Sequence, residues 1–214
     1  MRGSRRIVRL AGLALIAAVG LSQGVLAFPK PSPFPVAWEL KFEHAKPQRV
    51  VVQVPGEATP RAYWFLTYTV TNNTDRDVEF LPQFLMVTKE GTVIRSDRMV
   101  PKAAFDKVKA ATNNKLLESA LKVAGTLRVG EDQAKDGVAI WEEPEARMGS
   151  FTIFVTGLSG ESTPLTDNDG KPLNDKDGKP ILLFKTLQLD YNVSGDELYA
   201  GDPINQTGKQ WIMR

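Results

Sequence analysis

Two acidic segments hold the side chains best suited to binding a metal ion. Residues 167–173 and, eight positions further on, residues 175–181 each place two aspartates just ahead of a glycine. Calcium loops use this arrangement because several hard oxygen ligands must converge around a tight turn. The candidate calcium ligands are therefore Asp167, Asp169, Asp175 and Asp177.

The calcium pattern is incomplete in both segments. If Gly170 or Gly178 occupies the sixth place of an EF-hand loop, the twelfth place holds Lys176 or Phe184. Neither residue can replace the bidentate glutamate that such a loop requires. Asp-Gly followed by Lys-Pro is also typical of a long hairpin tip, in which the glycine forms the turn. The sequence favours the hairpin and keeps calcium binding as the alternative.

Residues that could form a catalytic site are sparse. The chain has no cysteine, which removes disulfides, thiolate metal sites and cysteine nucleophiles. Its single histidine, His44, continues the alternation of a strand, which favours a strand-end residue over a general base. Glu142 and Glu143 are adjacent, so on a strand they point to opposite faces and cannot flank one substrate bond. We expect a protein that is not an enzyme and has no cofactor.

Aromatic side chains indicate a second kind of binding site. A sugar-stacking platform of the kind found in carbohydrate-binding sandwiches could be formed by Trp38, Trp64, Trp141 and Trp211, with Tyr63 and Tyr68. The alternative is that most of them are core residues, because strand alternation already accounts for Trp38 and Trp64.

Charge is unevenly distributed along the chain. Residues 101–128 carry six basic side chains against two acidic ones, whereas residues 131–145 carry six acidic side chains against one basic. The basic stretch could meet an anionic envelope surface, and the acidic stretch a cation or a basic partner. The alternative is a solvated helix face beside an acidic loop, with both screened by salt.

The elements that must position these residues are mostly strands. Alternation is strict from residue 36, and residues 62–71 have bulky side chains on both faces, which predicts a central strand. Pro82 interrupts the sheet at a bulge or edge, and the apolar tail at 211–213 is expected to dock. The predicted strands are 36–43, 49–54, 62–71, 78–86, 92–96, 138–141, 151–156 and 181–193.

The hydrophobic period changes between residues 101 and 124. Apolar side chains recur there at spacings of three or four, which predicts one broken helix or two short ones. Pro101 suits the start, Asn113 and Asn114 the interruption, and Gly125 the end. We expect a separable helical insertion in an antiparallel β-sandwich, because no regular strand-helix alternation predicts a parallel sheet.

The first 27 residues predict a cleaved signal peptide, followed by a Pro-rich extended lead-in at 28–35. Four arginines precede an apolar run of 12 residues, which is too short to span a bilayer, and Val-Leu-Ala supplies the cleavage site. Arg5 and Arg6 also resemble a twin-arginine signal, although the ordinary secretory route is favoured. Cleavage leaves a net charge of −2 and no further apolar stretch of that length, so neither nucleic acid nor a transmembrane helix is expected.

Four segments carry a resemblance to a family of uncharacterised bacterial secreted proteins. They are YWFLTYTVTNNT, GEDQAKDGVAIWEEP, FTIFVTGLSGE and KTLQLDYNVSGDE, in this order. The strand end at residues 68–74, with Val78 and Phe80 following, also resembles exported bacterial immunoglobulin-like modules. The resemblance implies one immunoglobulin-like β-sandwich domain over residues 36–214. It carries no activity and no catalytic residues.

Together these patterns predict a periplasmic or secreted, non-catalytic binding or structural module of the bacterial envelope. Its partner would be an envelope protein or a polysaccharide. The alternative function is a carbohydrate-binding or calcium-assisted adhesion module, which calcium-sensitive melting would distinguish from the first.

Overall fold

Antiparallel strands dominate the computed structural model of the protein, which describes residues 29–144, 148–193 and 204–214. Strands make up 49% and helices 10%, so the prediction of a mainly β protein is confirmed. The predicted signal peptide at 1–27 lies outside the described residues.

The first sheet is built around strand β3, as its bulky faces predict. β9 pairs along one side of β3, and β1 and β2 lie end to end along the other side. β7 pairs with β9 in the parallel sense. The bounds are β1 (Lys41–His44), β2 (Gln48–Val52), β3 (Arg61–Thr71), β7 (Glu118–Ser119) and β9 (Lys135–Glu142).

The second sheet is antiparallel throughout, and β12 and β10 lie at its centre. β13 pairs with β12, so the C-terminal tail docks as predicted, and β5 and β6 extend the sheet beyond β10. A separate pair, β4 (Val78–Phe80) and β8 (Gly125–Leu127), lies outside both sheets. The bounds of the second sheet are β5 (Gln83–Thr88), β6 (Val93–Arg95), β10 (Ser150–Thr156), β11 (Ser162–Pro164), β12 (Leu182–Val193) and β13 (Ile204–Met213).

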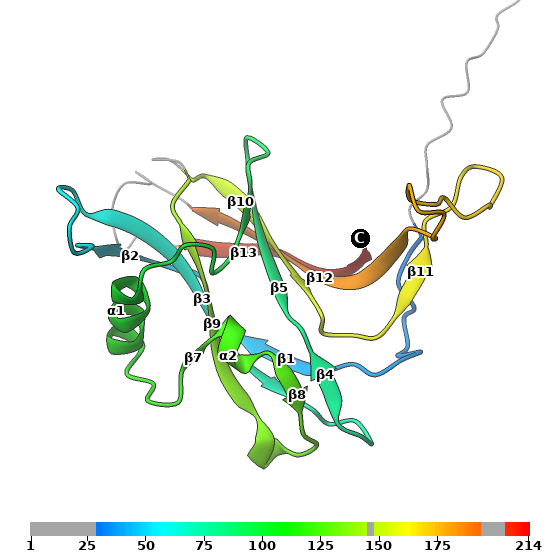
Figure 1. Cartoon of the computed structure of the whole chain (residues 1–214), viewed down its shortest axis with the longest axis horizontal. Helices are drawn as coiled ribbons and strands as arrows, with labels where there is room; N and C mark the ends of the chain where they lie inside the picture. The colour runs from blue at the N-terminus through cyan, green and yellow to red at the C-terminus, as the bar shows by residue number, and fades with distance from the viewer. Residues whose placement is uncertain (1–28, 145–147, 194–203) are drawn as a thin grey trace, which may run out of the picture.

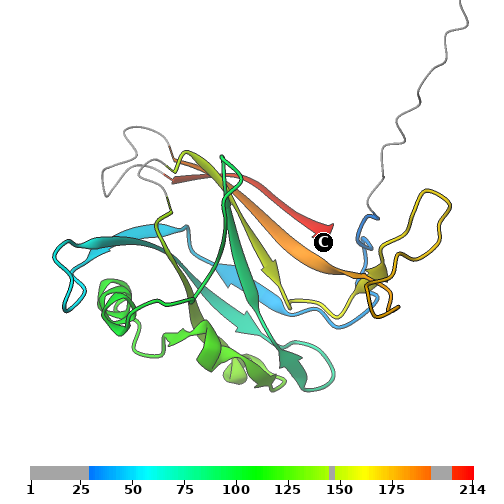
Figure 2. The same cartoon turned by 45° about the horizontal axis from the view of Figure 1, so that its top comes forward.

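The two sheets share one large core, and they cross each other in Figures 1 and 2. Alternate residues of β3, such as Trp64 and Leu66, point into this core. Phe84 of β5, Ile153 of β10 and Leu189 of β12 meet them from the second sheet. Burial of each large apolar side chain contributes about 1.5–3 kcal/mol, so this core is the main source of stability.

The first helix of the helical segment covers the opposite face of the first sheet. α1 (Lys102–Thr112) buries Ala104 and Val108 against Tyr63 and Phe65 of β3. α1 ends at Asn113 in a left-handed conformation, so the predicted interruption is confirmed. α2 (Ala120–Val123) places its two buried residues in the larger core. Whether the sheets fold without residues 101–124 stays a prediction.

The segment before β1 joins the two sheets. Leu40 N donates to Leu158 O at 2.8 Å, and Gly160 N donates to Trp38 O at 3.0 Å. These bonds tie residues 38–40 to the loop after β10, and only from Lys41 onward does the chain pair with β3. The strand predicted at 36–43 is therefore divided between two partners.

A buried ion cluster lies at this junction. Lys185 of β12 is almost fully buried, with its Nζ 2.9 Å from Glu39 Oε2 and 3.2 Å from Glu161 Oε2. Ser32 N of the lead-in donates to Glu161 Oε1 at 2.7 Å, and the Trp211 ring of β13 lies 5.2 Å from Nζ. Burial alone lowers the pKa of Lys185, but the two carboxylates more than offset this, and the pKa is raised.

A second buried charge lies in the connection from β6 to α1. Asp97 N donates to Ile140 O of β9 at 2.8 Å, and Asp97 adopts a left-handed φ of 60°. Burial raises the pKa of the Asp97 carboxyl to about 6, although contacts with Ser96 and Ile140 lower it in part. The carboxyl is therefore ionised in the folded protein at neutral pH at a cost in stability that the unfolded chain does not bear.

Replacing Lys185 with Met should destabilise the protein, because Glu161 and the partly exposed Glu39 would lose their countercharge. We expect a loss of about 3–5 kcal/mol in the free energy of unfolding, measured by urea titration. Lys41→Met is the matched control, because its ion pairs with Glu43 and Glu131 are exposed and their loss should change stability little. Equal losses for the two variants would contradict the role of the cluster.

Asp97→Asn should stabilise the protein in a pH-dependent way. The folded pKa lies above the unfolded value, so the parent loses stability as pH rises from about 4 to about 6. Asn carries no charge and tolerates a left-handed φ. Urea unfolding should show a gain on the order of 2 kcal/mol at about pH 8 and none at about pH 4. The exposed control Asp169→Asn should change little at either pH, and a gain that is independent of pH would refute the assignment.

Candidate functional site

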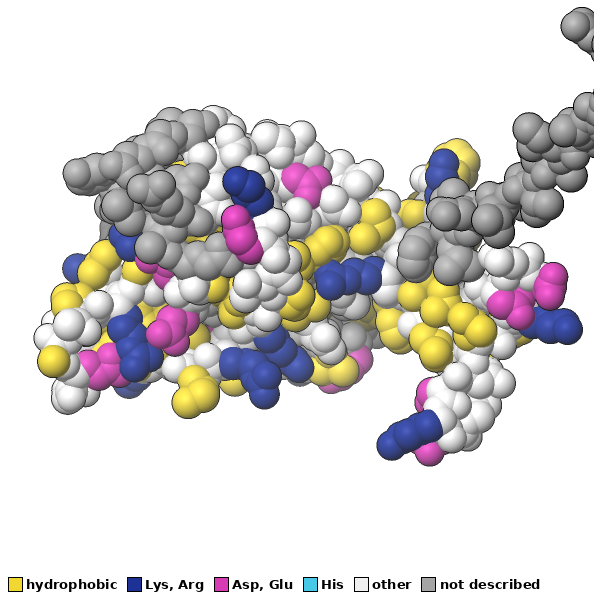
Figure 3. Space-filling view, turned by 90° about the horizontal axis from the view of Figure 1, so that it is seen from above, with side chains coloured by type: hydrophobic (Ala, Val, Ile, Leu, Met, Phe, Trp, Pro, Cys, Tyr) yellow, Lys and Arg dark blue, Asp and Glu magenta, His cyan; other side chains and the backbone are white. Residues whose placement is uncertain are grey.

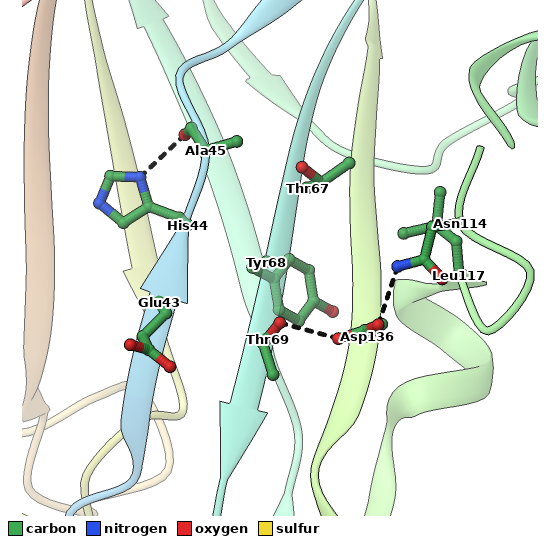
Figure 4. Close-up of a pocket in the computed structure, with 9 residues that line it drawn as sticks. All are labelled: Glu43, His44, Ala45, Thr67, Tyr68, Thr69, Asn114, Leu117 and Asp136. Atoms are coloured by element: carbon green, nitrogen blue, oxygen red, sulfur yellow. Dashed lines mark hydrogen bonds between the residues drawn. The ribbon is translucent and has the colours of Figure 1, made fainter. Parts of the chain in front are cut away.

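A groove of about 280 Å³ opens on the face of the first sheet that α1 leaves partly uncovered (Figure 4). β1, β3 and β9 form its floor, and the loop after α1 forms one wall. Polar side chains predominate, with one buried leucine at the wall. The groove is lined by Glu43, His44, Ala45, Thr67, Tyr68, Thr69, Asn114, Leu117 and Asp136.

A row of three polar residues crosses the floor of the groove. Glu43 of β1 is directly opposite Thr69 of β3, and Thr69 is directly opposite Asp136 of β9. Directly opposite residues point to the same face of a sheet, so the two carboxylates lie on either side of the threonine. Thr69 Oγ1 donates to Asp136 Oδ1 at 2.7 Å, which fixes both side chains.

Asn114 holds the row in place from the wall. Its Nδ2 donates to Asp136 Oδ2 at 2.8 Å, so both oxygens of Asp136 accept a hydrogen bond. Its Oδ1 accepts from Leu116 N at 2.9 Å, which stabilises the turn after α1. The carboxylate of Glu43 is more exposed and pairs with Lys41 at 3.3 Å. The groove therefore offers acceptors in fixed positions at Asp136 and an adaptable acceptor at Glu43.

His44 and Tyr68 contribute to the groove without pointing their rings at this row. They are directly opposite each other, and Tyr68 belongs to the core on the other face. In Figure 4 the His44 ring points away from Asp136, and its Nδ1 lies 3.0 Å from Ala45 O. Burial lowers the pKa of His44 and raises that of Tyr68 above its usual range. His44 ends β1, as predicted, and its ring is not placed to take a proton from a ligand beside Asp136.

Tyr68 also explains the glycine on β9. Gly137 is directly opposite Tyr68, and an added Cβ would lie 2.3 Å from the tyrosine Cζ. Any larger residue there would force the ring out of the core and disturb the neighbouring Asp136. Glycine at this position therefore supports the floor of the groove.

The paired glutamates at the end of β9 point to opposite faces, as predicted. Glu142 lies 3.1 Å from Arg61, whereas Glu143 accepts from Arg49 at 2.6 and 2.8 Å. Trp64 Nε1 also donates to Glu143 at 3.0 Å. Glu142 and Glu143 are therefore engaged in separate ion pairs and do not form one site.

Most of the aromatic side chains considered for a platform belong to the core. Trp64 and Trp141 are buried between the sheets, and Trp38 and Trp211 pack against the same cluster. Tyr63 is buried under α1. These residues belong to the core or pack against it, as the alternative interpretation predicted, and they do not form a stacking platform.

The acidic segments form an arm with two loops, in place of the single hairpin tip that the sequence favours. One loop is closed by a bridge between Thr166 and Pro172, and the other by a bridge between Asn174 and Pro180. Figure 3 shows two lobes projecting from the body, with hydrophobic side chains gathered at their base. Backbone bonds between residues 165, 173 and 181 tie the two loops together.

The four candidate calcium ligands are divided between these loops. Asp167 Oδ1 accepts from the backbone N–H of residues 169 and 171, and Asp175 Oδ1 accepts from residues 177 and 179, all at 2.9 Å. Asp169 and Asp177 are exposed. Across the described ranges, no group of three His, Cys, Asp or Glu side chains is placed to hold a metal ion.

The sequence analysis missed Glu43, Thr69, Asn114 and Asp136. The one local signal is a threonine at 67, 69 and 71, on a single face of a strand whose other residues are bulky. Such a polar stripe indicates a part of the sheet that no helix covers. Its partners come from β1, β9 and the loop after α1, which only the strand register identifies.

Calcium should leave the stability of the protein unchanged, because Asp167 and Asp175 already accept backbone hydrogen bonds that close their loops. Melting temperatures with a chelator and with excess calcium should agree within about one degree. The double variant Asp169→Asn with Asp177→Asn serves as the control. A calcium-dependent rise that this variant abolishes would instead support the calcium alternative.

In the parts of the chain that the structure describes, no helix combines the length and the apolar character needed to cross a membrane. Comparison with family models, curated proteins and solved structures found no match to the chain. The resemblance to bacterial secreted proteins with an immunoglobulin-like module therefore stays a prediction.

Proposed function

We propose that the protein is an exported, non-catalytic binding module of the bacterial envelope, and that its groove binds a segment of polysaccharide. The observation that carries this proposal is the cross-strand row of Glu43, Thr69 and Asp136. Sugar hydroxyls can donate to closely spaced acceptors, which the carboxylates of Glu43 and Asp136 and the Thr69 hydroxyl oxygen provide. The signal-peptide pattern of residues 1–27 supports export to a periplasmic or extracellular location.

The proposed scaffold is an immunoglobulin-like β-sandwich. Two sheets that share one core, with antiparallel pairing around β3 and throughout the second sheet, support this assignment. Residues 38–40 bond to the loop after β10, and from residue 41 the chain pairs with β3. Edge strands of sandwiches can switch between sheets in this way, which also supports the assignment. A rigid sheet is a suitable base for a binding site because it fixes the spacing of side chains across strands.

The same row argues against glycoside hydrolysis. Both oxygens of Asp136 already accept hydrogen bonds, from Thr69 and Asn114. Glu43 is paired with Lys41 at the exposed edge, where water is not excluded. Glycoside hydrolysis needs a protonated carboxyl as the general acid and a carboxylate with a free oxygen as the nucleophile or base. Neither Glu43 nor Asp136 is arranged for either role.

Thr69→Val should weaken oligosaccharide binding, because it removes the central hydroxyl without changing the shape of the side chain. Isothermal titration of chito-, cello- and xylo-oligosaccharides should give a Kd for the parent, and the variant should bind the same sugar about tenfold more weakly. The bound sugar should be recovered intact.

Thr152→Val on the second sheet is the matched control. Thr152 Oγ1 donates to Asp190 Oδ1 at 2.7 Å, the same bond and distance as in the groove. This variant should bind sugar as the parent does. Parent protein that binds none of these sugars, or two variants that lose affinity equally, would refute the groove as the site, and cleaved sugar would refute the non-catalytic assignment.

A further inference from the structure

The helical layer exposes more apolar surface than its place in the fold requires. This layer consists of α1, α2 and the chain from residue 97 to residue 124, and it lies along one side of the molecule in Figures 1 and 2. Leu116 and Leu121 are 76% and 77% exposed, and Met99 is 95% exposed. Single exposed apolar residues are common, but three within one layer indicate a surface that contacts something.

The Met99 backbone strengthens this observation. Met99 has a left-handed φ of 55°, which non-glycine residues rarely adopt. The residue therefore holds a costly conformation while its side chain stays in solvent. Burial in the folded protein does not account for this arrangement.

Lysines surround these apolar side chains. A groove of about 360 Å³ between α1 and α2 has Phe105 and Leu117 at its apolar part. Lys102, Lys109 and Lys122 line it, together with the acidic residues Asp106 and Glu118. Lys115 and Lys122 are immediate neighbours of Leu116 and Leu121 in the chain, and both lysines are exposed.

The charges of the layer are only partly compensated. Lys102 pairs with Asp106, and Lys109 Nζ donates to Leu117 O at 3.1 Å. Across the described parts of the chain, Lys115 and Lys122 make no ion pair within 4 Å. The layer therefore presents two lysines without ion pairs beside the exposed leucines, and Glu118 is the one carboxylate near them without an ion pair in the described part of the chain.

We propose that the helical layer docks on a membrane surface of anionic phospholipids. Lys115 and Lys122 pair with lipid phosphates, and Leu116 and Leu121 insert between the headgroups. Isolated leucines between lysines suit a lipid interface, where each side chain can insert separately, better than a protein partner, which favours one continuous apolar patch. Basic residues at an anionic bilayer each add to binding within a short distance of the surface.

The four residues proposed to contact lipid do not line the oligosaccharide groove, and only the location in the envelope rests on the proposed function. The two proposals can therefore fail separately. Sugar binding with no vesicle binding would leave the groove proposal intact, and the reverse result would leave the lipid proposal intact.

The test is sedimentation of the exported protein with vesicles, after intact mass has shown that its N-terminus begins at Phe28. The protein should bind phosphatidylglycerol mixed into phosphatidylcholine, and it should bind much less to phosphatidylcholine alone. Lys115→Glu with Lys122→Glu, and separately Leu116→Ser with Leu121→Ser, should each weaken binding at least about tenfold. Salt should weaken binding of the parent.

Matched controls come from exposed residues elsewhere. Lys171→Glu with Lys179→Glu makes the same change in net charge on the arm, and Leu81→Ser removes an exposed leucine outside the layer. These variants should bind vesicles as the parent does. The proposal would be overturned if the control and test variants lost binding equally, or if the parent bound neutral vesicles equally well. It would also be overturned if the parent bound duplex DNA and no vesicles. Unchanged melting temperatures would show that the variants are folded.

Discussion

The fold depends on how one buried positive charge is compensated. Lys185 can be buried in β12 only if carboxylates reach it, because an unpaired buried charge costs several kcal/mol. Glu39 and Glu161 come from the two segments that bond to each other where the sheets meet. Any other pairing of the segment before β1 would remove Glu39 and leave Glu161 as the remaining carboxylate beside this charge. The cluster therefore selects the arrangement in which the chain crosses from one sheet to the other.

That arrangement decides where a binding surface is available. β3 buries one face between the sheets, so its other face must be covered by a separate element or remain polar. α1 is long enough to cover Tyr63 and Phe65 but not Thr67 and Thr69. The groove is the uncovered remainder of this face. Its chemistry follows from the polar residues that β1, β3 and β9 place there in register.

Local pattern predicted most of the long strands and the broken helix, but it predicted neither strand β13 nor the division of residues 78–88 into β4 and β5, and it did not predict the site. Alternation identified β3 as central, and Asn113 ended α1 as expected. Lys185 interrupts the apolar pattern of its strand. Its partner Glu39 lies more than a hundred residues away in the chain, so no local pattern indicates this ion pair. The row in the groove likewise depends on register between strands. Two loops replaced one hairpin because each Asp-Gly segment closes on its own aspartate.

The groove and the helical layer are not independent in structure, because one loop builds part of both. Asn114 donates to Asp136 in the groove and accepts from Leu116 N, and the Leu116 side chain extends into solvent from the layer. Leu117, the next residue, lines both hollows, and its carbonyl accepts from Lys109. A ligand that orders Asp136 and a membrane that immobilises Leu116 would therefore restrain the same turn.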